Sequence, residues 1–517
     1  MMSPAGAIET ASALPAEASA SNEGTRSWWR IADFGILAAW VAIVGFTLQH
    51  HEKWADEAQA WLIARDLSLR AIWFHELRYE GSPGLWHTLL WITQHVFHLG
   101  YGAIGVIGMA GATAGAALLI FKAPFPRYIR WPLAFTYVMV YQYAVIARPY
   151  TLLPLLAFAA DLLFKDLQHP ERMAVILVLL ANLSLHGTIL AACLGLVYLL
   201  DARKSWHTFD AHLRKRYWVC VSAMALTLVF LFLILRPTPD VAEFATKEQA
   251  KLFQQPTHSQ KLLGGISGAF LDYPIPSFVF MLGAGLWCYT RRRLLVFLLP
   301  VGLLTALYSL VHGYAHHHGA LFVAAITAIW IAWPDEAELS AFNSRARWCM
   351  QGITVLLLCL CGMNIWDASV VVKREYLYPY SGGEDAAKYL KAVGADRAPM
   401  FGYLFGVVAV QAYFDHNIFA NMPTAYFHQG VPLRGTALEV EELRAVNPEY
   451  VVAYSVDPQL MLDTDGPMWR SLGYEMVHFS DGYYLYKQSV YQREGYLIFR
   501  RMGANPDAEV GNRAMRQ

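Results

Sequence analysis

Long apolar runs separated by short charged loops dominate the chain up to about residue 370. The first run covers residues 31–48. Further runs lie at residues 83–99, 103–121, 131–147, 149–165, 172–186, 187–201, 217–236, 277–290, 294–312, 317–333 and 348–366. Runs of this length match the thickness of a bilayer when they are helical. The pattern therefore predicts a polytopic α-helical membrane protein with about 11 to 12 transmembrane segments.

The pattern changes near residue 373 to that of a soluble domain. GGEDAAKYLKAVG and LEVEELRAVN predict helices, whereas APMFGYLFG and PEYVVAYSV predict strands. YEMVHFSDGYYLYKQ predicts a hairpin that turns at Asp481–Gly482. Alternating helices and strands indicate a small C-terminal α/β domain at residues 373–490, followed by a polar tail at 491–517.

The N-terminal end has two parts. Residues 1–27 are rich in Ala, Ser, Glu and Pro and lack periodicity, which is typical of a disordered tail. The transmembrane domain then covers residues 28–372. Its first run is too long for the core of a signal peptide and lacks a small-residue cleavage site, so we expect a retained anchor. Arg26 and Arg30 precede this run and indicate a cytoplasmic N-terminus, with residues 50–83 as the first external loop.

Loop charges bear on how many runs cross the membrane. If every run crosses, the basic segments 122–130, 203–216 and 291–293 all lie outside, against the usual cytoplasmic excess of Lys and Arg. If residues 83–99 do not cross, all three segments lie inside. That run carries His87, Gln94, His95 and His98, and such polar groups are costly in lipid. We therefore favour eleven crossings, with a cytoplasmic N-terminus and a periplasmic C-terminal domain.

This topology places most polar groups at helix ends on one outer side, where such groups tend to be functional. They are Asp56, Glu76, Glu80, Arg148, His186, His312, His316, His317 and His318. The long external loop 237–276 is also on this side. It contains five prolines around the weakly amphipathic piece EFATKEQAKLFQQ, and we expect it to face the substrate.

Composition excludes several classes of protein. At 56% hydrophobic and 15% charged residues, the chain is too apolar for an ordinary soluble protein. Its formal net charge is zero, which gives no indication of a nucleic-acid partner. The six cysteines lie in or beside apolar runs at spacings that match no ligand pattern, which argues against disulfides and thiolate metal sites.

Four short motifs follow one another in the membrane domain. The acidic pair Asp56–Glu57 follows the first run, YEGSPGLWH comes about 25 residues later, then ARPYTLLPLLAF, and HHHGALF opens a late helix. In this order they resemble the polyprenyl-phosphate-dependent glycosyltransferases of the GT-C fold, which include protein O-mannosyltransferases and the aminoarabinose transferase of lipid A. The resemblance covers about residues 30 to 335.

The resemblance implies a role for several residues. Asp56 would be the catalytic general base, with Glu57 beside it in the substrate site. Arg148 and Tyr150 would contact the departing lipid phosphate. The histidines His316, His317 and His318 would supply a further contact to the donor phosphate.

Each role has an alternative. Asp56 can cap the helix that starts at AQAWLIARDL, and Arg148 can be an interfacial arginine that extends its charge to water. The three histidines, with His50, His51 and Asp56, have the side chains of a divalent metal site, although adjacent histidines on a helix cannot easily face one ion. We assign no metal and no certain cofactor.

One motif departs from the family pattern. Ser82–Pro83–Gly84 stands where a His-Pro-Pro or Lys-Pro-Pro sequence is usual, so the side chain that would meet the lipid phosphate is missing there. Glu80 or His87 lies nearby and is included in the substrate site, and Arg148 remains the best cation. His186, at the start of a helix, receives no role.

The resemblance therefore implies an inverting glycosyltransferase of the bacterial inner membrane. Its donor would be a polyprenyl-phosphate-linked sugar, and its acceptor a glycolipid, a polysaccharide or a protein on the periplasmic side. One alternative is a lipid-head-group transporter or flippase, although the chain shows no repeated halves. Another is a polysaccharide polymerase or ligase that uses a lipid-linked glycan.

Overall fold

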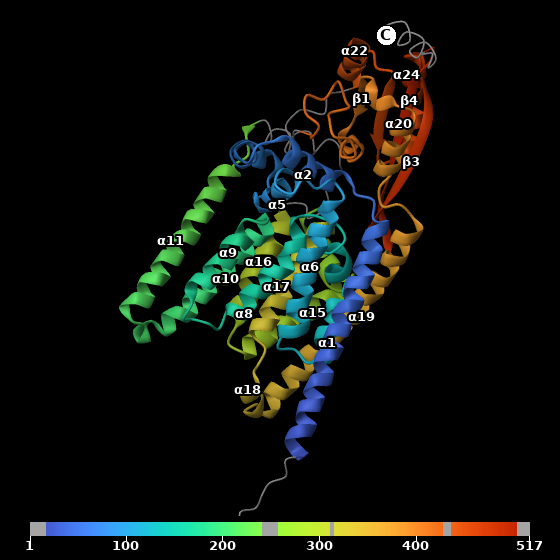
Figure 1. Cartoon of the computed structure of the whole chain (residues 1–517). Helices are drawn as coiled ribbons and strands as arrows, with labels where there is room; N and C mark the ends of the chain where they lie inside the picture. The colour runs from blue at the N-terminus through green and yellow to red at the C-terminus, as the bar shows by residue number, and fades with distance from the viewer. Residues whose placement is uncertain (1–16, 240–256, 311–314, 428–435, 504–517) are drawn as a thin grey trace, which may run out of the picture.

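A tall helical domain carries a smaller α/β domain at one end (Figure 1). The computed structural model describes residues 17–239, 257–310, 315–427 and 436–503. Helix α1 (Glu17–His50) runs along one side of the helical domain next to α19 (Ser344–Leu377), which leads directly into the C-terminal domain. The predicted architecture, a polytopic helical membrane protein with a small C-terminal α/β domain, is confirmed.

Five helices are long and apolar enough to cross a membrane. They are Trp28–His50 of α1, α6 (Ala103–Lys122), α10 (Leu185–Lys204), α11 (Ala211–Ile234) and α19. A sixth crossing is possible for α14 (His258–Ala269) with α15 (Pro274–Thr290), which meet at a 70° bend. The remaining apolar helices are shorter: η3 with α8 (Pro149–Leu163), α9 (Pro170–Ala181), α16 (Leu294–Leu310) and α17 (His318–Ile331). The count of eleven crossings stays a prediction.

The run at residues 83–99 forms α5 (Leu85–His95), which has only 11 residues. At 1.5 Å per residue this helix is about 16 Å long, roughly half the hydrocarbon thickness. It packs on α2 (Ala55–Asp66), where Gln94 Nε2 donates to Trp61 O at 3.1 Å and His95 Nε2 to Ala64 O at 3.1 Å. These two bonds satisfy Gln94 and His95 inside the protein.

The predicted basic segments gather at the end of the helical domain opposite the C-terminal domain (Figure 1). Asp33 in α1 binds Arg127 at 3.1 Å and Arg130 at 3.3 Å. Arg293, in the turn after α15, pairs with Asp201 at the end of α10. The basic segments thus share one end with the start of α1, as the charge rule required.

The C-terminal domain has a four-stranded sheet in the order β1-β2-β4-β3. The strands are β1 (Met400–Tyr403), β2 (Tyr450–Ser455), β3 (Tyr474–Tyr486) and β4 (Ser489–Arg501). β1 and β2 are parallel, and the other pairs are antiparallel. Helices α20 (Gly383–Ala392) and α22 (Thr436–Val446) form where the sequence predicted them, and the sheet buries aromatic and aliphatic side chains on both faces.

The predicted hairpin turn is wrong. β3 continues through Asp481 and Gly482, and the chain turns instead at Lys487, whose φ is +53°. A Cβ on Gly482 would lie 2.5 Å from Ser381 Cα, so this glycine allows close backbone packing rather than a turn. The polar tail predicted from residue 491 is also wrong, because β4 extends to Arg501 and pairs with both β2 and β3.

Two further boundaries differ from the prediction. The external loop 237–276 contains α14, which starts with a capping box at Thr257 and packs on α16 and α17. The piece EFATKEQAKLFQQ lies outside the described residues. Helix α1 begins at Glu17, inside the predicted disordered tail 1–27, because extending an existing helix costs much less than starting one.

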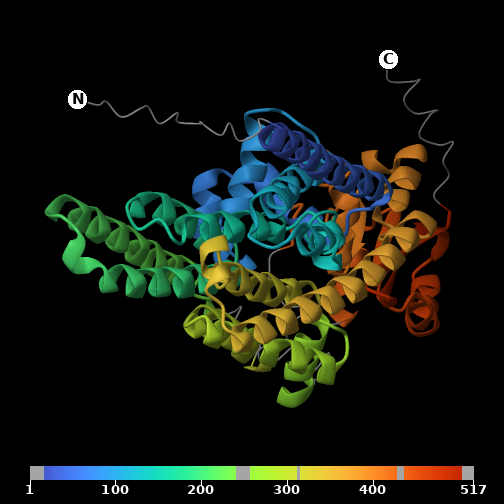
Figure 2. The ribbon, with the colours of Figure 1, turned by 90° about the horizontal axis from the view of Figure 1, so that it is seen from below.

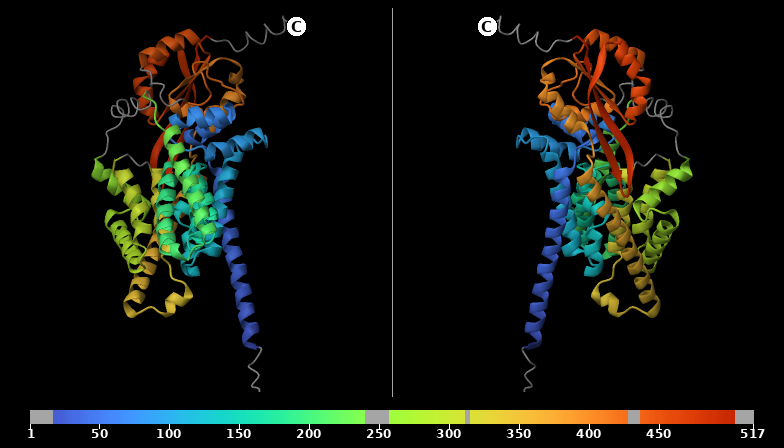
Figure 3. Two further views of the ribbon diagram at one scale, coloured as in Figure 1. Left: turned by 90° about the vertical axis from the view of Figure 1, so that its left-hand side faces the viewer. Right: turned by 90° about the vertical axis from the view of Figure 1, so that its right-hand side faces the viewer.

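The β3–β4 hairpin reaches from the C-terminal domain down to the helices (Figure 3). At its tip Lys487 pairs with Asp272, and Gln488 Nε2 donates to Asp367 Oδ1 at 2.8 Å. Viewed from below (Figure 2), α11 lies at the edge of the bundle far from this hairpin. The C-terminal domain is therefore fastened to one side of the membrane domain.

Candidate functional site

Asp56 lies in the first turn of α2, at the end of the helical domain that faces the C-terminal domain. The helix is capped by Glu57, whose Oε2 accepts a hydrogen bond from the Trp54 backbone N–H at 3.2 Å. The capping role considered for Asp56 is therefore taken by its neighbour. Asp56 is left with 28% of its side chain exposed, near the positive end of the helix dipole.

Arg148 faces Asp56. Its Nη1 lies 2.8 Å from Asp56 Oδ2, and its guanidinium lies over the rings of Trp54 and Tyr150, at 5.5 and 5.9 Å from their centroids. Nη1 is buried, and besides this ion pair none of the described residues offers it a hydrogen-bond acceptor. A merely interfacial arginine would extend to water; this one is enclosed with a donor available for a further oxygen.

Two carboxyl groups near Arg148 are more basic than usual. Burial raises the pKa of Asp56, against the opposing effect of Arg148, and Glu57 raises it further. Burial also raises the pKa of Glu80 to about 7, although a hydrogen bond from Gln59 Nε2 to its Oε1 at 2.9 Å opposes this. Asp56 is thus suited to take up a proton, and Glu80 can carry one at neutral pH.

Aromatic and imidazole rings enclose the Asp56–Arg148 pair. The His316 and His317 ring centroids lie 4.2 Å apart, and His316 lies 6.3 Å from both Trp54 and Tyr150. His317 lies 5.8 Å from Tyr150 and 4.8 Å from His186. The structure therefore brings together Asp56, Arg148, Tyr150, His316 and His317.

A short π-helical turn, η2 (Val138–Gln142), holds the histidine segment in place. Gln142 Nε2 donates to Ala315 O at 2.9 Å, and Tyr143 Oη donates to His316 O at 3.1 Å. From the other side, Tyr308 Oη donates to His317 O at 2.6 Å. These bonds fix the backbone of the segment; π-helical turns are frequent at functional sites for such reasons.

His318 does not join this group in the way the sequence predicted. Its Nδ1 donates to Tyr486 Oη at 3.1 Å, and Tyr486 in turn donates to Gly268 O at 3.0 Å. The ring therefore faces the hairpin tip and α14. Consecutive residues at the start of a helix point in different directions, which explains why His318 separates from its two neighbours.

Glu57 lies beneath the site rather than in it, contrary to its expected contact with substrate. Its side chain is fully buried, with Oε2 at 3.1 Å from His51 Nε2 and Oε1 accepting from the Ala147 N–H at 2.7 Å. His51 Nδ1 also lies 2.5 Å from Glu375 Oε1, and Tyr141 donates to Oε2 of Glu375 at 2.7 Å. We call His51, Glu57, Tyr141 and Glu375 the buried support.

The charge of the buried support follows from these contacts. Burial alone would lower the pKa of His51, but Glu57 and Glu375 outweigh it and raise that pKa to about 10. His51 is therefore protonated at neutral pH and bridges two carboxylates. With both nitrogens engaged, His51 does not serve the metal site considered for the histidines, and the described residues contain no group of three or more metal ligands.

His87 also departs from its expected place. It lies in α5 with 2% exposure, and neither ring nitrogen has a hydrogen-bond partner among the described residues. Burial lowers the pKa of His87 to about 4, so the ring is neutral at pH 7. It cannot supply the cation that is missing at Ser82–Pro83–Gly84, which leaves Arg148 as the cation beside Asp56.

The chain was compared with known proteins by sequence and by structure. No family model and no curated protein matches it. Two solved structures share its fold: ArnT from Cupriavidus metallidurans in the apo state, with a TM-score of 0.53, and ArnT bound to undecaprenyl phosphate, with a TM-score of 0.52. The chain has the GT-C fold.

The likeness to the two ArnT structures extends over almost the whole chain. The apo structure covers 92% of this chain and 98% of its own, and the undecaprenyl phosphate complex covers 91% and 98%. Sequence identity is 12% in both cases. The GT-C fold expected from four short motifs is thus confirmed, whereas the roles of individual residues rest on the geometry described above.

Two residues of the cluster around Asp56 and Arg148 were not assigned from the sequence. Trp54 covers Arg148, and His186 extends the imidazole group with its Nδ1 at 3.3 Å from Tyr150 Oη. Trp54 stands two residues before Asp56, and His186 follows the helix cap Ser184. Their positions at the starts of helices, on the side where polar groups were expected to gather, were the available signals.

Proposed function

We propose that the protein is a membrane glycosyltransferase. It moves a sugar from a polyprenyl-phosphate-linked donor to an acceptor on the outer face of the membrane in which it lies. The observation that carries this proposal is the Asp56–Arg148 pair at 2.8 Å, enclosed by aromatic and imidazole rings at the end of a GT-C membrane domain. ArnT, which has the same fold, was solved bound to undecaprenyl phosphate.

Asp56 and Arg148 have different roles in the proposed reaction. Asp56 takes the proton from an acceptor hydroxyl as that oxygen bonds to the anomeric carbon of the sugar. The bond between this carbon and the phosphate oxygen breaks, and the electron pair leaves with the lipid phosphate. Attack from the side opposite the leaving group inverts the anomeric centre. The raised pKa of Asp56 makes it a stronger base than an exposed aspartate.

Arg148 stabilises the departing phosphate. A guanidinium stays charged and can contact two phosphate oxygens at once. Its buried Nη1, which besides the ion pair with Asp56 has no acceptor among the described residues, provides one such donor. Tyr150 and the His316–His317 pair border the same space. Glu80, with a pKa of about 7, can donate a hydrogen bond from its protonated form.

The proposal includes an orientation in a bacterial inner membrane. The basic segments and the start of α1 share one end of the helical domain, and Asp56 lies at the other. Since Lys and Arg are enriched in cytoplasmic loops, the Asp56 end and the C-terminal domain are periplasmic. The acceptor is a glycolipid, a polysaccharide or a protein on that side.

The test is sugar transfer by Asp56→Asn from a polyprenyl-phosphate-linked donor. Removing a general base costs roughly 10²- to 10⁴-fold in rate, whereas donor binding through Arg148 should remain. Asp66→Asn, at the far end of α2, is the matched control and should retain wild-type turnover. Full turnover by Asp56→Asn would contradict the assignment. Donor movement across the membrane without transfer by the wild type would indicate a flippase instead.

A further inference from the structure

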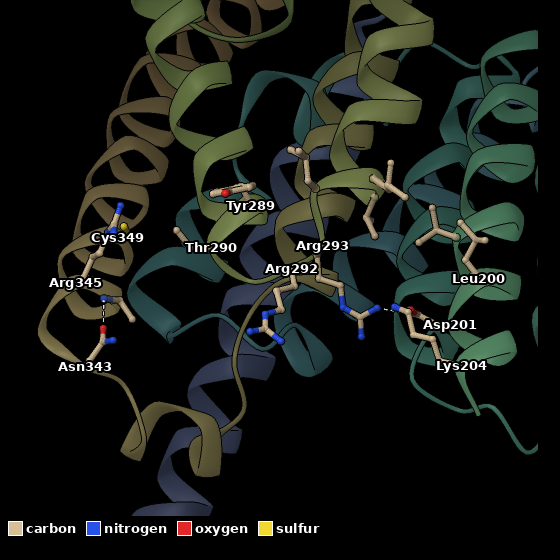
Figure 4. A pocket seen from close by; sticks show the side chains of 15 residues that line it. Leu200, Asp201, Lys204, Tyr289, Thr290, Arg292, Arg293, Asn343, Arg345 and Cys349 are labelled. Carbon is tan, nitrogen blue, oxygen red and sulfur yellow. Dashed lines mark hydrogen bonds and ion pairs between the residues drawn. The ribbon is translucent and has the colours of Figure 1, made fainter. Parts of the chain in front are cut away.

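A cavity of about 830 Å³ lies where α19 begins, at the end of the membrane domain opposite the C-terminal domain (Figure 1), and Figure 4 shows the residues that line it. Its walls come from the last turns of α10, the turn between α15 and α16, and the first turn of α19. Neither Asp56 nor Arg148 lines it. The charged residues that do are Asp201, Lys204, Arg292, Arg293 and Arg345. The cavity is therefore separate from the proposed catalytic site.

Positive charge exceeds negative charge in this cavity. Its one carboxylate, Asp201, pairs with Arg293 and binds Lys204 Nζ at 2.7 Å. Arg292 and Arg345 have no ion pair and no side-chain hydrogen bond among the described residues. Two guanidinium groups are thus left over to bind an anion.

Arg292 also occupies a strained backbone position. Its φ is +55°, and its N–H donates to Tyr289 O at 3.0 Å while the Arg293 N–H donates to Cys288 O at 2.7 Å. This is the Schellman arrangement that ends a helix, and glycine is the usual residue at the left-handed position. Here an arginine stands at that position, which places a cation on the wall of the cavity (Figure 4).

The rest of the cavity wall is apolar and can contact a hydrocarbon chain. Leu200, Leu295 and Tyr289 line the cavity with 36%, 45% and 66% of their surfaces exposed. They lie on membrane helices or the ends of membrane helices, where exposed apolar side chains face lipid. At the other side α19 begins after Asn343, whose Oδ1 accepts from the Ala346 N–H at 2.9 Å, so the positive end of this 34-residue helix also borders the space.

We propose that this cavity binds an anionic glycerophospholipid of the bilayer. Arg292 holds the headgroup phosphate, Arg345 adds positive charge from the wall formed by α19, and an acyl chain lies along Leu200 and Leu295. A free phosphate ion would leave this apolar wall unused, and the polyprenyl-phosphate donor is assigned to the opposite end. Basic pockets between membrane helices at the cytoplasmic side are suited to such headgroups.

The experiment titrates the purified full-length protein, in zwitterionic detergent, with phosphatidylglycerol and phosphatidylcholine and counts bound lipid by native mass spectrometry. The wild type should prefer phosphatidylglycerol. The double variant Arg292→Gln with Arg345→Gln should bind phosphatidylglycerol roughly 30-fold more weakly. Each cation near a phosphate contributes about half to one order of magnitude in affinity. Lys215→Gln with Arg347→Gln removes the same charge from exposed residues outside the cavity and should bind as the wild type does.

A second variant separates lipid binding from folding. Arg292→Gly suits the positive φ, so its melting temperature should equal or exceed that of the wild type while phosphatidylglycerol binding weakens. Equal losses in the cavity variant and the exposed control would overturn the proposal, as would equal wild-type affinity for the two lipids. Displacement of phosphatidylglycerol by inorganic phosphate alone, or preferential binding of undecaprenyl phosphate in the cavity, would also overturn it.

Discussion

Asp56 and Glu57 are adjacent carboxylates in one helical turn, yet they lie in different surroundings. Glu57 is fully buried and binds His51, the Trp54 N–H and the Ala147 N–H. Asp56 is partly exposed and forms an ion pair with Arg148 Nη1, which has no further hydrogen-bond acceptor among the described residues. Neighbouring positions in an α-helix point about 100° apart, which places one acid beneath the site and the other in it.

The contacts of Glu57 show how the buried support positions Asp56 and Arg148. Glu57 binds the backbone N–H of Ala147, the residue directly before Arg148. Through His51 it is linked to Glu375 of α19, and Tyr141 links Glu375 to the π-helical turn that holds the His316 segment. The buried support thus joins α1, α2, α19 and the segment of Arg148, and the Asp56–Arg148 pair depends on its geometry.

The largest effect is expected for Glu57→Gln. This change leaves the protonated His51 with one carboxylate instead of two, and breaking a buried charge pair costs about 3 to 5 kcal/mol. The melting temperature in detergent should fall clearly, with activity lost in proportion to unfolded protein. Glu441→Gln, on an exposed helix of the C-terminal domain, is the control and should change stability by less than about 0.5 kcal/mol. A Glu57→Gln protein as stable as the wild type would contradict the structural role that distinguishes Glu57 from Asp56.

A somewhat smaller effect is expected for Arg148, and it should appear in activity rather than in stability. Arg148→Gln removes the charge beside the leaving phosphate and should reduce transfer by about 10²- to 10³-fold. Arg148→Lys keeps the charge but loses the two-pronged contact, so its rate should lie between those of Arg148→Gln and the wild type. Transfer rates are compared at equal amounts of folded protein. A wild-type rate for Arg148→Gln would show that another cation meets the phosphate.

The smallest effect per pH unit is a dependence of stability on pH that comes from His51. Its pKa is raised in the folded protein to about 10, so its contribution is fully present below about pH 6.5 and is lost as the pH rises toward 10. The loss amounts to at most about 1.4 kcal/mol per pH unit in that window. Melting temperatures between pH 6.5 and 9 should fall more steeply for the wild type than for His51→Gln. Equal slopes would contradict a charged His51.

Much of the architecture could be predicted from the hydrophobic pattern, because membrane helices and alternating strands leave strong periodic signals. The hairpin turn could not. Asp481–Gly482 has the composition of a turn, but Gly482 serves a close approach to Ser381 that only the folded domain reveals. The strand at 489–501 also differs from the predicted polar tail, because its charged residues flank the buried run 496–499, which pairs with β2.

The candidate site was predicted in part. The order of short motifs indicated that Asp56, Arg148, Tyr150 and the His316 segment belong together, and the structure brings these residues into one place. The pattern could not tell which of two adjacent acids faces Arg148 or which of three histidines turns away. Such choices depend on partners distant in the chain, such as Glu375 for Glu57 through His51, and Tyr486 for His318.

The most direct measurement of the central claim is an experimental structure of the protein with a bound polyprenyl-phosphate-linked sugar. The account predicts phosphate oxygens within hydrogen-bond distance of the Arg148 guanidinium, with the anomeric carbon on the side of Asp56 and no contact to Glu57. A phosphate bound away from Arg148, or a sugar whose anomeric carbon lies out of reach of an acceptor held by Asp56, would contradict it.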